Sequence, residues 1–139
     1  MIILDTNVIS EPLRPTGDAA VLAWLDHQDI ETLYLTTITI AELRFGIAAL
    51  PSGKRRSRLE EDFENGILSL FIGRILAFDE AATITYARIR SKARSTGKAI
   101  GVTDAFIAAI AAHHEFAVAT RDVSPFEVAG VRVINPWKL

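Results

Sequence analysis

Short apolar runs alternate along this chain with longer stretches in which apolar residues recur every three or four positions. The runs are rich in β-branched and aromatic residues, which is typical of strands. They cover residues 1–4, 32–36, 74–78, 116–120 and 131–134. Because helical stretches separate them, the connections are crossovers, and crossovers join parallel strands. The pattern therefore predicts an α/β fold with a mainly parallel central sheet of about four to five strands and helices on both faces.

The stretches between the runs carry helix signals. Asp18 and Asp79 are placed to cap helices that begin directly after them, and Gly97 is placed to end the second of these helices near Thr96. A turn or short helix is expected over residues 7–15, where two prolines interrupt the chain. The remaining helices are expected over residues 19–27, 39–50, 54–72, 79–96 and 103–114.

Composition narrows the class of protein. At 139 residues, half of them hydrophobic and 23% charged, the chain has the size of one compact domain over residues 1–139. It contains no cysteine, which excludes disulfides and thiolate metal sites. No segment reaches the roughly 18 uncharged apolar residues of a membrane span, and no basic-flanked leader begins the chain. We therefore expect a soluble protein of the cytoplasm with no membrane partner.

Four of the 17 acidic residues lie within or beside apolar sequence. Asp5 closes the first apolar run, and Asp122 follows the run that ends at residue 120. Glu42 sits inside an apolar helical stretch, and Asp104 opens another. A carboxylate next to buried structure is costly to desolvate unless it is paired, capped or bound to a metal. These four residues therefore need an explanation that the other acids do not.

Each of the four has an ordinary structural explanation when it is taken singly. Asp104 would be favourable in the first turn of a helix, and Glu42 would either pair with Arg44 or point to solvent from the polar side of its helix. Asp5 and Asp122 would serve as turn residues after strands. Taken together they indicate more, because the carboxyl ends of parallel strands meet at one edge of a sheet, where reactive groups gather.

A cluster of acids at this edge requires a cation. Carboxylates about 4 Å apart repel one another by roughly 4 kcal/mol per pair at an effective dielectric constant near 20. Oxygen ligands without cysteine or histidine favour Mg²⁺ or Mn²⁺, and Mg²⁺ is often completed by phosphate oxygens of a substrate. The cluster therefore indicates metal-assisted phosphoryl chemistry.

The segments that carry these acids resemble a known family. "LDTNV", "TIAELRFGI", "TDAFIAA" and "ATRD" are similar, in this order, to the four acidic elements of the PIN-domain ribonucleases. Over the whole chain, to the terminal "NPW", the sequence resembles the VapC-type toxins of bacterial toxin-antitoxin pairs, specifically the FitB-like branch. The resemblance implies a three-layer PIN-like fold and an endoribonuclease that leaves a 5′-phosphate.

The resemblance also assigns roles to residues. It implies that Asp5, Glu42, Asp104 and Asp122 bind Mg²⁺ or Mn²⁺ and act in catalysis, with Thr120 beside them. Thr6 and Asn7 are further polar neighbours of the site. It implies a homodimer, a small cognate antitoxin of the VapB or FitA kind, an RNA substrate, and contact with DNA only through the antitoxin.

Basic residues concentrate in the middle of the chain, although the net charge is −2. Residues 88–98 hold five basic residues and no acid. Two interpretations stay open, a solvated helix surface or a patch that follows the RNA backbone. The candidate RNA contacts are Arg88, Arg90, Lys92 and Arg94. The basic residues of 54–58 are instead interpreted as local pairs, Arg56 with Glu60 and Arg58 with Asp62.

Other functions compete with RNA cleavage. A phosphatase of the strand-then-acid type would need a second acid at the position of Asn7. A DNA-directed nuclease of the PIN or flap type would use the same four acids, and a non-catalytic module that regulates transcription with its antitoxin would not need them.

Overall fold

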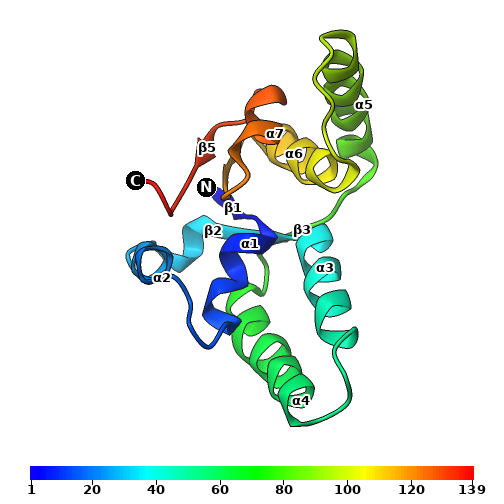
Figure 1. Ribbon diagram of the computed structural model, residues 1–139. Helices are drawn as coiled ribbons and strands as arrows, with labels where there is room; N and C mark the ends of the chain where they lie inside the picture. The colour runs from blue at the N-terminus through cyan, green and yellow to red at the C-terminus, as the bar shows by residue number, and fades with distance from the viewer.

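Five short strands form one parallel sheet in the computed structural model, which describes residues 1–139 (Figure 1). The strands are β1 Ile2–Leu4, β2 Leu33–Thr36, β3 Ile75–Leu76, β4 Ala117–Ala119 and β5 Val133–Ile134. Their order across the sheet is β3-β2-β1-β4-β5. Every neighbouring pair is parallel. The chain therefore extends the sheet in one direction from β1 to β3 and in the other from β4 to β5, and the order reverses at β1.

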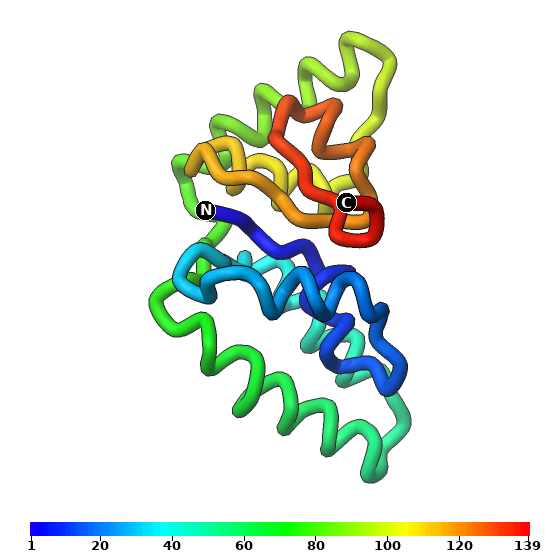
Figure 2. The backbone as a smooth tube through the Cα atoms, turned by 90° about the vertical axis from the view of Figure 1, so that its left-hand side faces the viewer, coloured from blue at the N-terminus to red at the C-terminus, as the bar shows by residue number.

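Seven α-helices connect and cover the strands. They are α1 Thr6–Ile9, α2 Ala19–Asp26, α3 Thr37–Ala48, α4 Lys54–Glu61, α5 Glu80–Ser95, α6 Val102–His114 and α7 Val123–Val128. Helices α5, α6 and α7 lie on one face of the sheet, and α1, α3 and α4 lie on the other (Figures 1 and 2). The predicted three-layer arrangement is confirmed. No helix is long and apolar enough to cross a membrane.

The central strands are buried on both faces. Ile3 and Val118 belong to the hydrophobic core beneath α5, α6 and α7, whereas their neighbours Leu4 and Ala119 belong to the core on the opposite face. Successive side chains of a strand point to opposite faces. Strands with helices on both sides are therefore apolar throughout rather than alternating, and this is why the strand signals in the sequence were continuous apolar runs.

Most predicted element boundaries hold within a few residues. Asp18 and Asp79 cap α2 and α5 as expected, with Asp79 Oδ1 accepting a hydrogen bond from the Ala82 N–H at 3.0 Å. Gly97 follows the end of α5 with a φ of 71°, a left-handed conformation that favours glycine. The run at 74–78 was predicted as a strand, but only Ile75 and Leu76 pair with β2.

The chain is helical from Lys54 to Phe71, close to the predicted range 54–72, but it does not form one α-helix throughout. Helix α4 ends at Glu61, a π-helix follows over Asp62–Ile67, and a 3₁₀-helix over Leu68–Phe71. Phe63, Ile67 and Phe71 are spaced by four residues and all contribute to the same core. An α-helix has 3.6 residues per turn, so a spacing of four drifts around its surface, and a wider π turn corrects this drift.

Removal of the Asp79 cap should destabilise the protein. In Asp79→Ala the N–H of Ala82 loses its hydrogen bond, and we expect the free energy of unfolding to fall by about 1 kcal/mol. Denaturant titration followed by circular dichroism measures this. Glu80→Ala removes an acid from the same turn without removing the cap, so it should cost clearly less. Equal losses in the two variants would contradict a capping role.

Candidate active site

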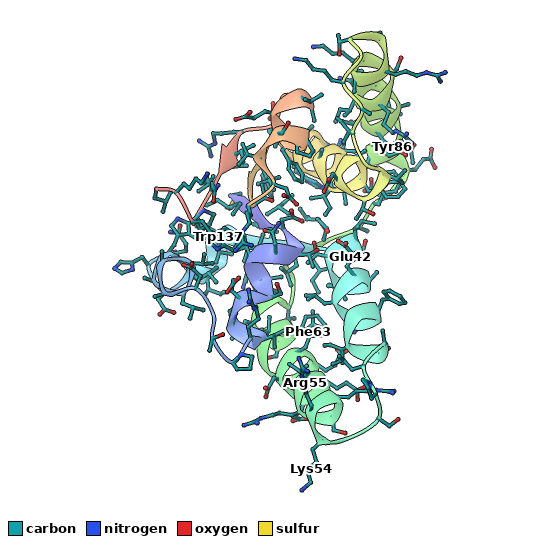
Figure 3. All side chains as sticks on the ribbon, in the orientation of Figure 1. Glu42, Lys54, Arg55, Phe63, Tyr86 and Trp137 are labelled. Carbon is teal, nitrogen blue, oxygen red and sulfur yellow. The ribbon has the colours of Figure 1, made fainter.

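The structure brings the four predicted acids to one edge of the sheet. Asp5 directly follows β1, and Glu42 lies on α3, which begins where β2 ends (Figure 3). Asp104 lies in the first turn of α6, and Asp122 lies between β4 and α7. The carboxylates of Asp104 and Glu42 each raise the pKa of Asp5. Those of Asp122 and Glu42 raise the pKa of Asp104. The four acids therefore form one electrostatically coupled cluster, as predicted.

Asp5 is the buried member of the cluster, with 5% of its surface exposed. Its carboxylate accepts hydrogen bonds from the Thr6 N–H at 2.8 Å and from the Thr120 hydroxyl at 2.7 Å. Burial raises its pKa to about 6, and the two hydrogen bonds oppose this rise only in part. Neighbouring carboxylates raise this pKa further, and no arginine or lysine lowers it. Asp5 therefore lacks the cation that a buried carboxylate normally has.

Thr120 joins two of the acids. Its hydroxyl is fully buried, donates to Asp5 Oδ2, and accepts a hydrogen bond from the Asp122 N–H at 3.0 Å. Asn7 Nδ2 donates to the same hydroxyl at 3.3 Å and to Asp5 Oδ2 at 3.4 Å. The predicted placement of Thr120 and Asn7 beside the acids is therefore confirmed. The network fixes where the Asp5 carboxylate points.

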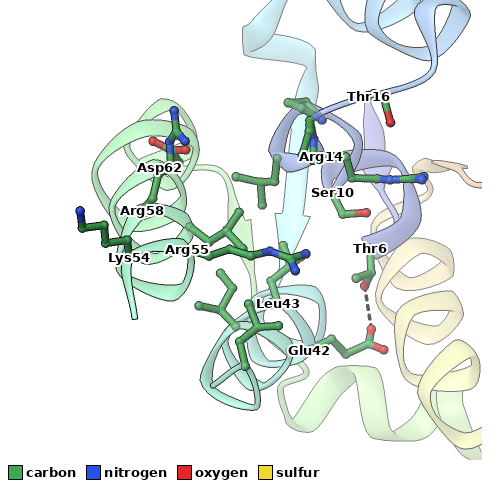
Figure 4. Close-up of a pocket in the computed structure, with 17 residues that line it drawn as sticks. Thr6, Ser10, Arg14, Thr16, Glu42, Leu43, Lys54, Arg55, Arg58 and Asp62 are labelled. Carbon is green, nitrogen blue, oxygen red and sulfur yellow. Dashed lines mark hydrogen bonds between the residues drawn. The ribbon is translucent and has the colours of Figure 1, made fainter. Parts of the chain in front are cut away.

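Glu42 is an exposed acid without a basic partner in the ion pairs of the structure. The hydroxyl of Thr6 donates to Glu42 Oε1 at 2.7 Å (Figure 4). Arg44 instead binds Glu64 through two hydrogen bonds of 2.7 and 3.2 Å. The pairing of Glu42 with Arg44 is therefore wrong, whereas the alternative in which Glu42 faces solvent agrees with its exposure.

Asp104 is half-buried, and burial is the largest cause of its raised pKa. The N-cap position of α6 belongs to Gly101, and Asp104 lies in the first turn behind it. An acid is favourable there because of the helix dipole, so this structural explanation remains compatible with the position. It does not explain why Asp104 faces other carboxylates, which raise its pKa.

The donor atoms of the cluster suit a hydrated divalent cation. They are carboxylate oxygens with hydroxyl oxygens beside them, which are the ligands of Mg²⁺ and Mn²⁺ rather than of Zn²⁺. No three of the acids stand close enough together to form a preformed metal cage. Mg²⁺ keeps several waters and is often bound through only one or two carboxylates, so this open arrangement is compatible with it.

A groove of about 1220 Å³ begins at Thr6 and Glu42 and continues between α1, α3 and α4 (Figure 4). Thr6 and Glu42 line one end, and Lys54, Arg55 and Arg58 line the part formed by α4. The sequence interpretation missed this groove because its residues come from several elements and loops that are far apart in the sequence. Of the two pairs proposed for α4, Arg56 with Glu60 is present at 3.2 Å. Arg58 and Asp62 form no ion pair and both line the groove.

The basic residues of α5 lie apart from this groove. Ile89 and Ala93 are buried, and Arg90 and Arg94 line a second hollow of about 640 Å³. Arg90 donates to the Tyr86 hydroxyl at 2.9 Å. Helix α5 extends away from the sheet (Figure 1). The structure does not bring these arginines against the four acids, and their contact with RNA stays a prediction.

Glu11 is a buried carboxylate that the sequence interpretation missed. Only 2% of its surface is exposed, although it lies in a polar-looking segment before Pro12. Its oxygens accept hydrogen bonds from the Asp18 N–H at 2.8 Å and from Arg14 Nη1 at 3.0 Å. The only feature of the sequence that could have indicated the burial of Glu11 is the apolar pair Val8 and Ile9 before it. This pair did not distinguish Glu11 from the acids on the surface.

Comparison with known proteins agrees with this geometry. The sequence model of the family "PIN domain" matches residues 2–131. "VapC ribonuclease Y4jK" of Sinorhizobium fredii is 55% identical to the chain, and "Toxin FitB" of Neisseria gonorrhoeae is 54% identical; each alignment covers 99% of both proteins.

Solved structures show the same fold. The crystal structure of FitAcB from Neisseria gonorrhoeae superposes with a TM-score of 0.97 at 54% identity over all of both chains. The structure of FitAB bound to a DNA fragment gives the same TM-score at 53% identity, over 100% of this chain and 97% of the other. Since the family model covers nearly all of the chain and the relatives match it from end to end, the chain belongs to the PIN domain family.

Proposed function

We propose that this chain is the toxin of a type II toxin-antitoxin pair and that it hydrolyses RNA endonucleolytically with a divalent cation. The coupled carboxylates of Asp5, Glu42, Asp104 and Asp122 carry the proposal, because they leave a concentrated negative charge beside an open groove. The names of the relatives, a VapC ribonuclease and the toxin FitB, support it. We take residues 1–139 as a single PIN domain.

PIN-domain nucleases generally depend on a divalent metal, and we propose Mg²⁺ or Mn²⁺ here. The proposed ligands are four carboxylates. Asp5 is buried and Asp104 is half-buried, whereas Glu42 and Asp122 are exposed. A bound ion of this kind would polarise the scissile phosphate and lower the pKa of a water molecule. Thr120 holds the Asp5 carboxylate in place through its hydroxyl.

The exposed acid Glu42 is placed to act as a general base. Its carboxylate is fixed by Thr6 and opens toward the groove. An acid that is not fully committed to the ion can orient or deprotonate the attacking water. We assign this role to Glu42.

The proposed partners follow from the same relatives. We propose a small cognate antitoxin of the VapB or FitA kind, contact with DNA only through that antitoxin, and a homodimer. The complexes FitAcB and FitAB support the first partner, and the FitAB complex with DNA supports the second. A DNA-directed nuclease would share the acids, so cleavage of matched RNA and DNA strands, with and without divalent ion, separates the two activities. A non-catalytic module would cleave neither.

Asp5→Asn should abolish cleavage without unfolding the protein. Loss of one charge-stabilising group at a reacting phosphate lowers kcat by about 100-fold or more. Asp18→Asn is the matched control, because Asn also caps helices and Asp18 lies outside the cluster, so this variant should cleave normally. Cleavage kinetics and thermal melting of both variants provide the measurement. Retained activity in Asp5→Asn would remove Asp5 from the site.

The same variant should be at least as stable as the wild type at pH 7.5 without metal. Because the folded-state pKa of Asp5 is raised to about 6 from 3.8, ionisation of Asp5 destabilises the fold increasingly between these pH values and fully above the upper one. Asn removes this cost, and the benefit should vanish near pH 4. A melting temperature well below that of the wild type at pH 7.5 would indicate a structural role for Asp5.

Metal binding should follow the ionisation of Asp5. Cleavage should stop in excess chelator and return with Mg²⁺ or Mn²⁺, whereas Ca²⁺ should bind and support little chemistry. Since protons compete with the ion for Asp5, the Kd for Mn²⁺ should rise by up to about tenfold per pH unit below about pH 6. Calorimetric titration between pH 5 and 8 measures this. Full activity in chelator, or a Kd independent of pH, would contradict the proposed site.

Two basic surfaces can be compared as RNA contacts. We propose that Arg88, Arg90, Lys92 and Arg94 bind the RNA backbone. Arg90→Gln with Arg94→Gln should then weaken binding equally for different sequences and reduce the slope of log K against log salt by about 1.4, since each phosphate contact contributes about 0.7. Arg55→Gln with Arg58→Gln tests the groove in the same assay.

The outcomes of this comparison assign each surface. An unchanged salt slope in the α5 variant, with a reduced slope in the groove variant, would move the RNA contact to α4. Unchanged cleavage with weaker neutralisation by the antitoxin would assign α5 to the protein partner instead.

A further inference from the structure

Arg121 lies between two members of the active site, but its side chain points away from them. Its neighbours in sequence are Thr120, which binds Asp5, and Asp122 of the acidic cluster. The guanidinium is not among the groups that lower the pKa of Asp5 or Asp104. It stacks on the ring of Trp137, 4.2 Å from the ring centre, and its Nη2 lies 3.9 Å from Glu11 Oε1.

Both contacts of Arg121 are with side chains that are buried or half-buried. Glu11 is almost fully buried and is held by the Asp18 N–H and by Arg14. Trp137 is half-buried and packs against the core on the side of α2. In the view of Figure 3, Trp137 lies on the opposite side of α1 from Glu42. The side chain of Arg121 therefore links the strand end of β4 to two groups outside the acidic cluster.

The backbone of residues 120–122 is held by hydrogen bonds of its own. The Arg121 N–H donates to Asn7 Oδ1 at 3.1 Å, and the Asp122 N–H donates to the Thr120 hydroxyl at 3.0 Å. Asp122 itself is exposed and occupies the N-cap position of α7 without a side-chain hydrogen bond to that helix. The position of its carboxylate therefore depends on how firmly the backbone of residues 120–122 is held.

We propose that Glu11, Arg121 and Trp137, which we call the Arg121 anchor, position Asp122 for metal binding. The three are positioning residues, because none of them touches the acids whose geometry they set. The proposal rests on the proposed function in that it takes Asp122 as a metal ligand. It goes beyond that function by assigning a role to a buried acid, an arginine and an aromatic ring outside the acidic cluster.

The test uses two variants of the full-length protein. Arg121→Met keeps the length of the stem and removes the cation, and Glu11→Gln removes the buried charge while keeping a hydrogen-bond acceptor. We expect the Kd for Mn²⁺, measured by calorimetry without RNA, to rise about 3- to 10-fold in each, a loss at the lower end of the range seen for groups that orient metal ligands. For RNA cleavage, kcat should fall by a similar factor with KM unchanged.

Amide hydrogen exchange supplies a readout that does not depend on catalysis. The amides of Arg121 and Asp122 should exchange faster in both variants without metal, while the amides of β4 remain protected. The double variant Glu11→Gln with Arg121→Met should raise the Kd no further than the larger single change, because residues that act through one contact are not additive. Additive losses would show two independent effects and overturn the anchor.

A matched control separates positioning from general stability. Arg74 also stacks on an aromatic ring, 5.8 Å from the centre of Phe71, and also bonds to fixed groups, the carbonyl oxygens of Leu33 and Leu70. Arg74→Met should lower the melting temperature and leave the Kd for Mn²⁺ unchanged. If Arg74→Met weakens Mn²⁺ binding as much as Arg121→Met does, the effect is one of stability and the anchor is refuted.

Failure of the inference differs from failure of the proposed function. If the wild type binds Mn²⁺ and cleaves RNA while folded Arg121→Met and Glu11→Gln behave like the wild type, the anchor is wrong and the function stands. If the wild type neither binds Mn²⁺ nor cleaves RNA, the function itself is wrong, and the anchor falls with it.

Discussion

The buried carboxylate of Asp5 is the constraint on which the site depends. It lies at the end of β1, where the strand order reverses, and only hydroxyl and N–H groups bind it in the absence of a cation. Because burial and two neighbouring acids raise its pKa to about 6, the carboxylate is largely ionised near neutral pH at a cost in folding free energy. A bound cation would offset this cost.

The architecture explains why this position is available. β1 is the central strand, and its side chains enter cores on both faces of the sheet. The strand is therefore rigid, and the turn that follows it starts from a fixed point. Glu42 on α3 and Asp122 after β4 flank the same edge because β2 and β4 are the two neighbours of β1. A parallel sheet in this order brings together acids that are more than 100 residues apart in sequence.

Charge is distributed over the surface in a way that serves a polyanionic substrate despite a net charge of −2. Lys54, Arg55 and Arg58 line the groove that begins at Glu42, so phosphate groups would meet cations on the approach and carboxylates only at the centre. Arg44 forms its ion pair with Glu64 and not with Glu42. The two kinds of charge are therefore kept apart on the surface.

The sequence by itself determined the parallel α/β fold, the capping roles of Asp18 and Asp79, and the convergence of the four acids. These features depend on local periodicity and on the rule that parallel strands end at one edge. It did not determine the π-helix over Asp62–Ile67, the burial of Glu11 or the groove between α1, α3 and α4. Whether Glu11 also meets Arg121 depends on a segment about 110 residues away. Only the tertiary structure decides such contacts, because the local sequence does not indicate which distant side chain will pack against a given residue.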